Sequence, residues 1–147
     1  MKIIVTLLFI FIYLPSNSQD KALKFHIEYE EMKMKEKGEW SEWNFFGDIN
    51  EDMNSNILID FSNNSVTWDY RFKQDDRKFS SYNIISRKED TTYEDVNFYA
   101  TYFRVKQDKD ITNYELCFFG SDKEPYYILL TKTPLIETRY YLKKTDK

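Results

Sequence analysis

Histidine and cysteine, two side chains that commonly act as general base and nucleophile, are scarce in this 147-residue sequence. The chain holds one histidine, His26, and one cysteine, Cys117, so any histidine-based triad must use His26, and a Cys/His zinc cage lacks its ligands. His26 alternates with apolar residues, between Lys24 and Glu28, which places it on a solvated strand face. Cys117 lies in an apolar stretch with no histidine nearby to activate it. We expect a solvated imidazole and an inert thiol, with an intermolecular disulfide as the alternative for Cys117.

Acidic side chains are numerous enough that carboxylate pairs are unavoidable, with 25 Asp and Glu residues in the chain. Glu28 and Glu30 are two residues apart on one predicted strand face, and Asp75 and Asp76 are adjacent. Carboxylates at the former spacing lie about 7 Å apart, within the range of an inverting glycosidase pair. Such a pair also needs a cleft that raises one pKa, and no cleft is evident from the sequence. We therefore predict that the protein is not an enzyme.

One segment resembles the beginning of a calcium-binding loop. Residues 48–54 carry oxygen ligands at alternate positions, as that loop does. Met53 stands where the loop requires glycine, and Ile59 stands where it requires a bidentate glutamate. We expect a hydrated loop, with weak calcium binding as the alternative, and we predict no metal and no cofactor.

The beginning of the chain has the pattern of a secretory signal peptide. Lys2 supplies the positive charge, residues 3–14 are apolar, and residues 16–18 are small or polar ahead of a cleavage point. The apolar stretch is shorter than the roughly 20 residues of a membrane span. We predict residues 1–18 to be a signal peptide and residues 19–147 to be a single exported β domain, periplasmic or extracellular, without a transmembrane segment.

Alternation of apolar and polar side chains predicts strands along most of the remaining chain. In the first strand, one face is expected to hold Leu23, Phe25, Ile27 and Tyr29, and the other Lys24, His26, Glu28 and Glu30. The clearest unit is a hairpin of residues 57–61 and 66–72, joined by a Ser-Asn-Asn-Ser turn. Further strands are expected at residues 79–85, 96–106, 111–119, 126–131 and 138–143, and a less regular one at 39–46.

These strands predict an all-β protein, an antiparallel meander of about eight strands that forms a small barrel, with a β-sandwich as the alternative. Polar connections are expected at residues 74–78, 86–95, 107–110 and 120–125. Residues 96–105 are apolar on both faces, which is typical of a strand covered on both sides. The best candidate for a helix, residues 30–37, has strand-like spacing and no cap, so any helix there would be short.

Aromatic side chains that could hold a ligand occur in two places. The first group consists of Trp40, Trp43, Phe45 and Phe46, which could stack on a sugar, plug an open barrel end or pack on the core as a lid. The second group, Trp68 and Tyr70, shares a face of the predicted hairpin. We predict these six residues as candidate contacts for an unknown small molecule, glycan or protein. The formal net charge of −4 argues against a nucleic-acid partner.

Four short segments occur in a fixed order along the chain. They are Ser18-Gln19 at the end of the signal, Trp40-Ser41-Glu42-Trp43, the Asn56-Ile57-Leu58-Ile59-Asp60-Phe61 strand with its asparagine turn, and Tyr140-Tyr141-Leu142-Lys143. This set resembles small exported proteins of unknown function that are typical of Bacteroidota. The resemblance implies a compact β-barrel or sandwich, loosely similar to lipocalins, and it implies no catalytic residues. The lipocalin Gly-x-Trp signature that opens the first strand is absent, because Gly38-Glu39-Trp40 has its spacing but follows that strand.

The sequence therefore predicts an exported, non-catalytic binding or interaction module. The alternatives are a structural envelope protein without a ligand and a carboxylate-dependent hydrolase of envelope glycans. A hollow interior lined by aromatic rings would favour binding, a filled interior would favour a structural role, and two converging carboxylates would favour hydrolysis.

Overall fold

The computed structural model of the protein describes residues 22–45, 55–73, 76–93, 98–121 and 124–145, and this part of the chain contains strands and turns but no helix. The strands are β1 (Leu23–Glu36), β2 (Glu39–Trp40), β3 (Asn44–Phe45), β4 (Asn56–Asp60), β5 (Ser65–Lys73), β6 (Asp76–Tyr93), β7 (Phe98–Gln107), β8 (Asp110–Ser121), β9 (Glu124–Lys132) and β10 (Ile136–Lys144). The predicted signal peptide, the calcium-like segment 48–54 and Phe46 lie outside the described residues.

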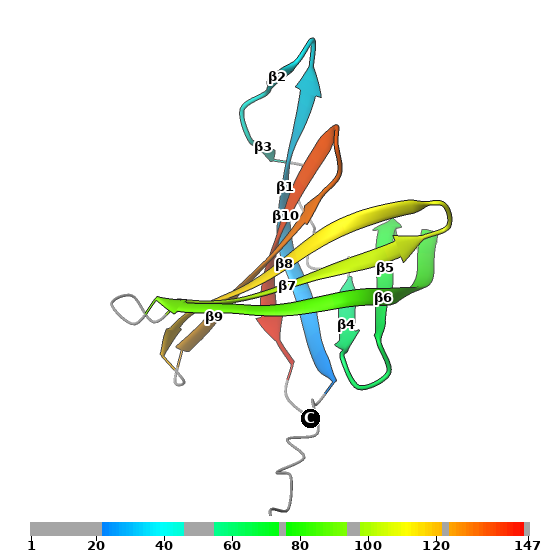
Figure 1. Ribbon diagram of the computed structural model, residues 1–147. Coiled ribbons are helices and arrows are strands. Elements are labelled where there is room, and N and C mark those ends of the chain that lie inside the picture. The colour runs from blue at the N-terminus through cyan, green and yellow to red at the C-terminus, as the bar shows by residue number, and fades with distance from the viewer. Residues whose placement is uncertain (1–21, 46–54, 74–75, 94–97, 122–123, 146–147) are drawn as a thin grey trace, which may run out of the picture.

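Eight of these strands close into an antiparallel barrel (Figure 1). From β4 to β10 each strand pairs with the next along the chain, β1 pairs with β4, and β10 returns to β1 and closes the sheet. Closure leaves no long unpaired edge in the barrel wall. The predicted all-β barrel is thus confirmed, and the sandwich alternative does not form.

The β4–β5 hairpin follows the sequence closely. The Asp60 carboxylate accepts hydrogen bonds from the backbone N–H groups of Ser62 and Asn63, both at 3.0 Å, and from their side chains at 2.6 and 2.7 Å. These bonds hold the pKa of Asp60 below its ordinary value. Asn64 adopts a positive φ of 50°, as expected of a turn asparagine.

Strand β1 contains one extra residue in its pairing with β10. Ile27 lies opposite Leu142 and Tyr29 lies opposite Tyr141, so Glu28 has no counterpart. A β-bulge of this kind shifts the alternation of side chains by one position. The inward face of β1 therefore changes from odd-numbered to even-numbered residues after Ile27.

This bulge overturns part of the predicted strand face. Tyr29 leaves the interior and stacks on Tyr141, with ring centroids 3.9 Å apart. Glu30, which was expected on the solvated face, is only 5% exposed. The predicted pairing of Glu28 with Glu30 on one face is also wrong, because Glu28 is exposed while Glu30 is buried.

Three further expectations are corrected in the neighbouring segments. Residues 30–36, considered for a helix, continue β1 to a turn at Lys37 and Gly38, whose φ angles of 52° and 93° suit a two-residue hairpin. Residues 39–45 form the short β2 and β3, each paired with β1, instead of one strand. Residues 86–93, expected in a connection, belong to β6.

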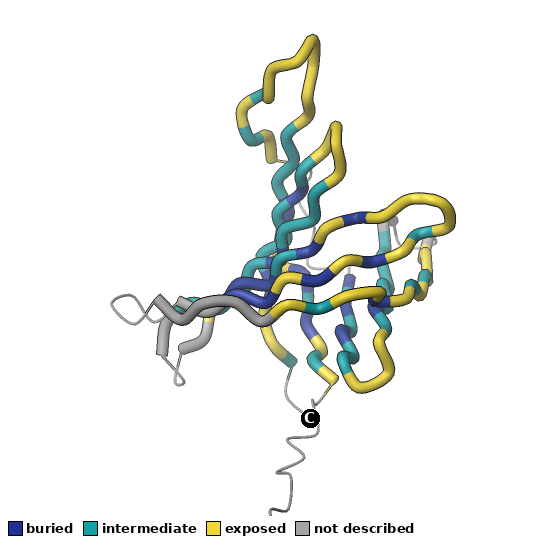
Figure 2. Tube along the Cα trace, in the orientation of Figure 1, coloured by how far each residue is buried: buried dark blue, intermediate teal, exposed yellow. Residues whose placement is uncertain are grey.

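Apolar side chains fill the interior toward the end of the barrel where β1 begins and β10 ends. Figure 2 shows the buried positions along the chain. The buried cluster consists of Phe25, Ile27, Ile57, Ile59, Val66, Ile84, Phe103, Val105, Tyr114, Leu116, Leu129 and Leu142. The predicted cover on both faces of β7 is absent at Tyr102, which is 38% exposed, although Ala100 on the same face and Phe103 on the opposite face are buried.

Candidate functional site

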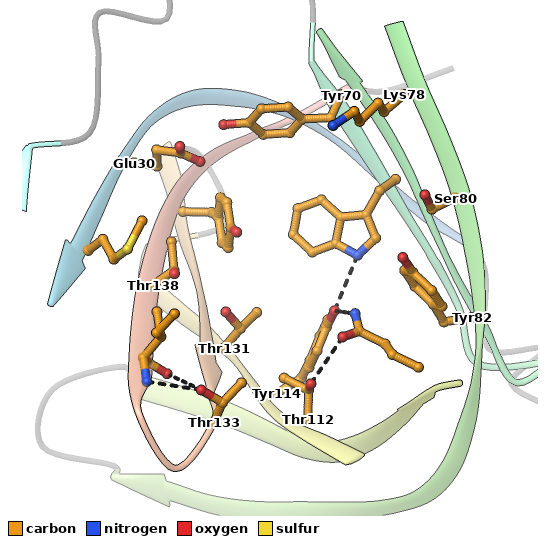
Figure 3. A pocket seen from close by; sticks show the side chains of 15 residues that line it. Glu30, Tyr70, Lys78, Ser80, Tyr82, Thr112, Tyr114, Thr131, Thr133 and Thr138 are labelled. Atoms are coloured by element: carbon orange, nitrogen blue, oxygen red, sulfur yellow. Dashed lines mark hydrogen bonds between the residues drawn. The ribbon is translucent and has the colours of Figure 1, made fainter. Parts of the chain in front are cut away.

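The opposite half of the barrel encloses a cavity of about 420 Å³, a volume within the usual range of small-molecule sites. The lining residues come from all barrel strands except β4 and from the β9–β10 turn (Figure 3). They are Glu30, Met32, Trp68, Tyr70, Lys78, Ser80, Tyr82, Gln107, Thr112, Tyr114, Thr131, Thr133, Ile136, Thr138 and Tyr140. Lys78, Thr133 and Ile136 are exposed, so the cavity opens at the end where they lie.

Small polar side chains explain why this half is hollow. On β9 the inward positions change from Leu129, which is fully buried in the packed half, to Thr131 at the cavity. On β10 they change from Leu142 through Tyr140 to Thr138. A threonine side chain reaches less far toward the barrel axis than leucine, so these positions leave space that a longer side chain would fill.

A chain of hydrogen bonds orders one wall of the cavity. Trp68 donates from Nε1 to the Tyr114 hydroxyl oxygen at 3.2 Å, Gln107 donates from Nε2 to the same oxygen at 3.2 Å, and Thr112 donates to Gln107 Oε1 at 3.2 Å. Burial raises the pKa of Tyr114 to about 12, so its hydroxyl stays protonated at neutral pH. Because both bonds at this oxygen are donated to it, its own proton remains able to donate to a molecule in the cavity.

Glu30 brings a carboxyl group into the cavity from β1. Glu30 is 5% exposed, and the Tyr70 hydroxyl donates a hydrogen bond to its carboxyl group. Figure 3 shows the Tyr70 side chain directed toward Glu30. Burial raises the pKa of Glu30 above its ordinary value, and the hydrogen bond from Tyr70 opposes this only in part. The pKa of Tyr70 is raised by its own burial and by Glu30, so the phenol remains the donor of this pair.

Aromatic rings surround this carboxyl group. The ring centroids of Trp68 and Tyr140 lie 4.9 Å apart at an angle of 57°, and those of Trp68 and Tyr114 lie 6.3 Å apart. Burial and the nearby Glu30 raise the pKa of Tyr140. The cavity is therefore an aromatic chamber with one buried carboxyl group, in which hydrogen bonds fix the orientation of several rings.

The structure divides the two groups of candidate aromatic residues. Trp68 and Tyr70 line the cavity together. Trp40 and Trp43 lie beside the Lys33 ammonium, each with the nitrogen 4.9 Å from a ring centroid, on the outward side of β1. Phe45 is 56% exposed. The structure does not bring this group to the cavity, and its contact with a ligand stays a prediction.

Several cavity residues were not singled out from the sequence. Thr112, Thr131 and Thr138 interrupt the apolar face of three predicted strands, a pattern from which a hollow barrel half could have been inferred. Glu30 offered no such signal, because only the bulge in β1 places it inside.

Other candidate chemistry does not converge on the cavity. The Cys117 thiol is buried, and burial and the neighbouring Glu115 carboxylate raise its pKa to about 12. The part of the chain that the structure describes has no group of three or more His, Cys, Asp or Glu side chains placed to hold a metal ion. The described residues also include no long apolar helix that could cross a membrane.

Fold and cavity together define a small closed β-barrel, packed at one end and hollow at the other. Comparison of the chain with known proteins finds no matching family model, no similar curated protein and no similar solved structure. The resemblance to small exported Bacteroidota proteins and to lipocalins therefore stays a prediction from the sequence.

Proposed function

We propose that the protein is an exported, non-catalytic module that binds a small, largely apolar molecule inside its barrel. The observation that carries this proposal is the contrast between the two halves of one interior. One half is filled by aliphatic and aromatic side chains, whereas the other keeps a cavity of about 420 Å³ lined by aromatic rings and a few polar groups. This composition is typical of small-molecule sites.

The same cavity argues against the two alternatives. A carboxylate-dependent hydrolase needs two carboxyl groups that flank the substrate bond, and among the described lining residues Glu30 is the one acid. A purely structural barrel gains nothing from an unfilled half, because lost contacts around an empty space cost stability. Ligand binding accounts for the cavity, which the other two roles leave unexplained.

The test fills the cavity without changing the rest of the barrel. Ser80 lines the cavity, and the adjacent Ser81 is exposed on the outer side of β6. The Ser80→Phe variant places a ring in the cavity, and Ser81→Phe is the matched control. The neutral dye N-phenyl-1-naphthylamine should bind to the wild-type protein with a rise in fluorescence.

We expect Ser80→Phe to weaken dye binding by at least about tenfold, because the new ring occupies the ligand volume, and Ser81→Phe to leave it unchanged. Thermal melting followed by circular dichroism checks that both variants fold. A wild-type protein that fails to bind the dye, or a folded Ser80→Phe variant that binds as well as Ser81→Phe, would refute the proposal.

A further inference from the structure

The charges in the cavity are distributed unevenly. Glu30 is 5% exposed and lies among aromatic rings. Lys78, the one basic residue among the described lining residues, is exposed on β6 near the opening. The deep part of the cavity thus carries an acid, and the opening carries a base. Glu30 is thus the one acid among the described residues that a molecule inside the cavity meets.

Burying this carboxyl group is unfavourable unless the charge is compensated. A carboxylate offers about four acceptor sites, and Tyr70 supplies a hydrogen bond to it. A buried charge without a cation nearby is unfavourable and tends to be neutralised by a proton, and burial accordingly raises the pKa of Glu30. A positively charged group bound beside Glu30 would remove the cost, because it favours the ionised carboxylate.

The neighbouring rings suit the same kind of group. Trp68 and Tyr140 lie with their ring centroids 4.9 Å apart, and Tyr70 contacts Glu30 from β5. Aromatic faces attract organic cations through their quadrupole, most strongly where water is excluded, and indole is the strongest of the three ring types. A carboxylate beside two tyrosine rings, one of which packs against a tryptophan ring, is a combination that suits alkylated ammonium groups.

From this arrangement we infer that the molecule bound in the barrel carries an organic ammonium group, which binds against the Glu30 carboxylate and the surrounding aromatic rings. The inference rests on the proposed binding function and names the chemical class of its ligand. The apolar remainder of the ligand extends toward the threonine-lined part of the cavity, and the Tyr114 hydroxyl can donate to an acceptor there.

Several other titratable groups line the cavity with Glu30. They are Tyr70 from β5, Tyr140 from β10, Tyr114 from β8, and Lys78 and Tyr82 from β6, which line the same cavity. Tyr70, Tyr114 and Tyr140 have raised pKa values and stay neutral below pH 9. The like charge of Lys78 at the opening opposes the binding of a cation nearby.

The experiment compares three probes that share an octyl chain, namely octyltrimethylammonium, 1-octanol and octyl sulfate, as competitors of the neutral dye N-phenyl-1-naphthylamine. The quaternary ammonium keeps its charge at every pH, so any pH dependence comes from the protein. We expect it to displace the dye at concentrations on the order of tenfold lower than 1-octanol does, with octyl sulfate the weakest of the three.

Two glutamate variants test whether Glu30 causes the preference for the ammonium probe. Glu30→Gln keeps an acceptor for Tyr70 but removes the charge, and it should reduce the preference for the ammonium probe over 1-octanol to less than about threefold. Glu28→Gln changes the exposed glutamate at the bulge of the same strand and should leave that preference unchanged. Lys78→Met should strengthen displacement by the ammonium probe, because it removes a like charge at the opening.

The pH dependence is a second readout. Affinity of the wild-type protein for octyltrimethylammonium should increase as pH rises from 4 to 8, because Glu30 must ionise, while Glu30→Gln should show no such increase. Equal displacement by the ammonium and alcohol probes, or equal effects of Glu28→Gln and Glu30→Gln, would overturn the inference while dye binding still supports a binding cavity. Failure of the dye itself to bind would instead refute the proposed function.

Discussion

Truncating an inward side chain to alanine should lower the free energy of unfolding much more in the packed half of the barrel than in the hollow half. Leu129 is fully buried and pairs with Leu116 on β8 and Tyr140 on β10, both of which point inward. Replacing it with alanine removes its aliphatic contacts and leaves a space that a closed barrel cannot easily collapse. Buried leucine-to-alanine changes cost about 2–5 kcal/mol, and we expect about 3–4 kcal/mol here, a decrease in Tm of roughly 10–15 °C.

Ile136→Ala is the control variant, at the open end of the barrel cavity. Ile136 lines the cavity opening and is 39% exposed, so Ile136→Ala removes fewer contacts and should cost less than about 1.5 kcal/mol. Urea unfolding followed by far-ultraviolet circular dichroism gives the free energy of unfolding of both variants and of the wild type. If Leu129→Ala lowers the free energy of unfolding by less than about 1.5 kcal/mol, or if both variants lower it equally, the barrel is not packed in one half and hollow in the other.

Two carboxyl groups should affect stability in opposite directions. The pKa of Glu30 is raised in the folded protein, so its charge lowers stability as pH rises above about 4.5, the ordinary value of this group. Glu30→Gln should therefore be more stable than the wild type in urea unfolding at pH 8, and the advantage should disappear near pH 3. The pKa of Asp60 is lowered by bonds from Ser62 and Asn63, so these bonds stabilise the fold above pH 4 and are weakened as acid protonates Asp60. Asp60→Ala should cost about 1 kcal/mol at pH 7 and much less at pH 2, and a cost that does not change with pH would contradict this role of the Asp60 charge.

The parts of the fold that depend on local sequence were predictable. The β4–β5 hairpin has regular alternation and an asparagine turn, and its two strands pair as expected. Trp68 and Tyr70 could be named as candidates because they share the inward face of that hairpin. Alternation fixes which side chains share a face, and closure of the barrel then turns that face inward.

Features that depend on distant pairing could not be predicted. Residues 86–93 are rich in charged and polar side chains, which favoured a loop, yet they form part of β6. Most of that segment pairs with β7, and the preceding part of β6 pairs with β5. Backbone hydrogen bonds to neighbouring strands sustain the strand, so a polar composition does not exclude strand structure.

The bulge in β1 connects the least predictable feature of the fold with its most distinctive chemistry. Continuous alternation would keep Tyr29 inside and Glu30 in solvent, and the cavity would then lack an acid among its described lining residues. One extra residue at Glu28 reverses this, and it is detectable only through the pairing of β1 with β10, more than 100 positions later in the chain. The resulting buried carboxyl group lowers stability above its ordinary pKa, and a stability cost at one position inside a ligand-sized cavity is typical of a site kept for binding.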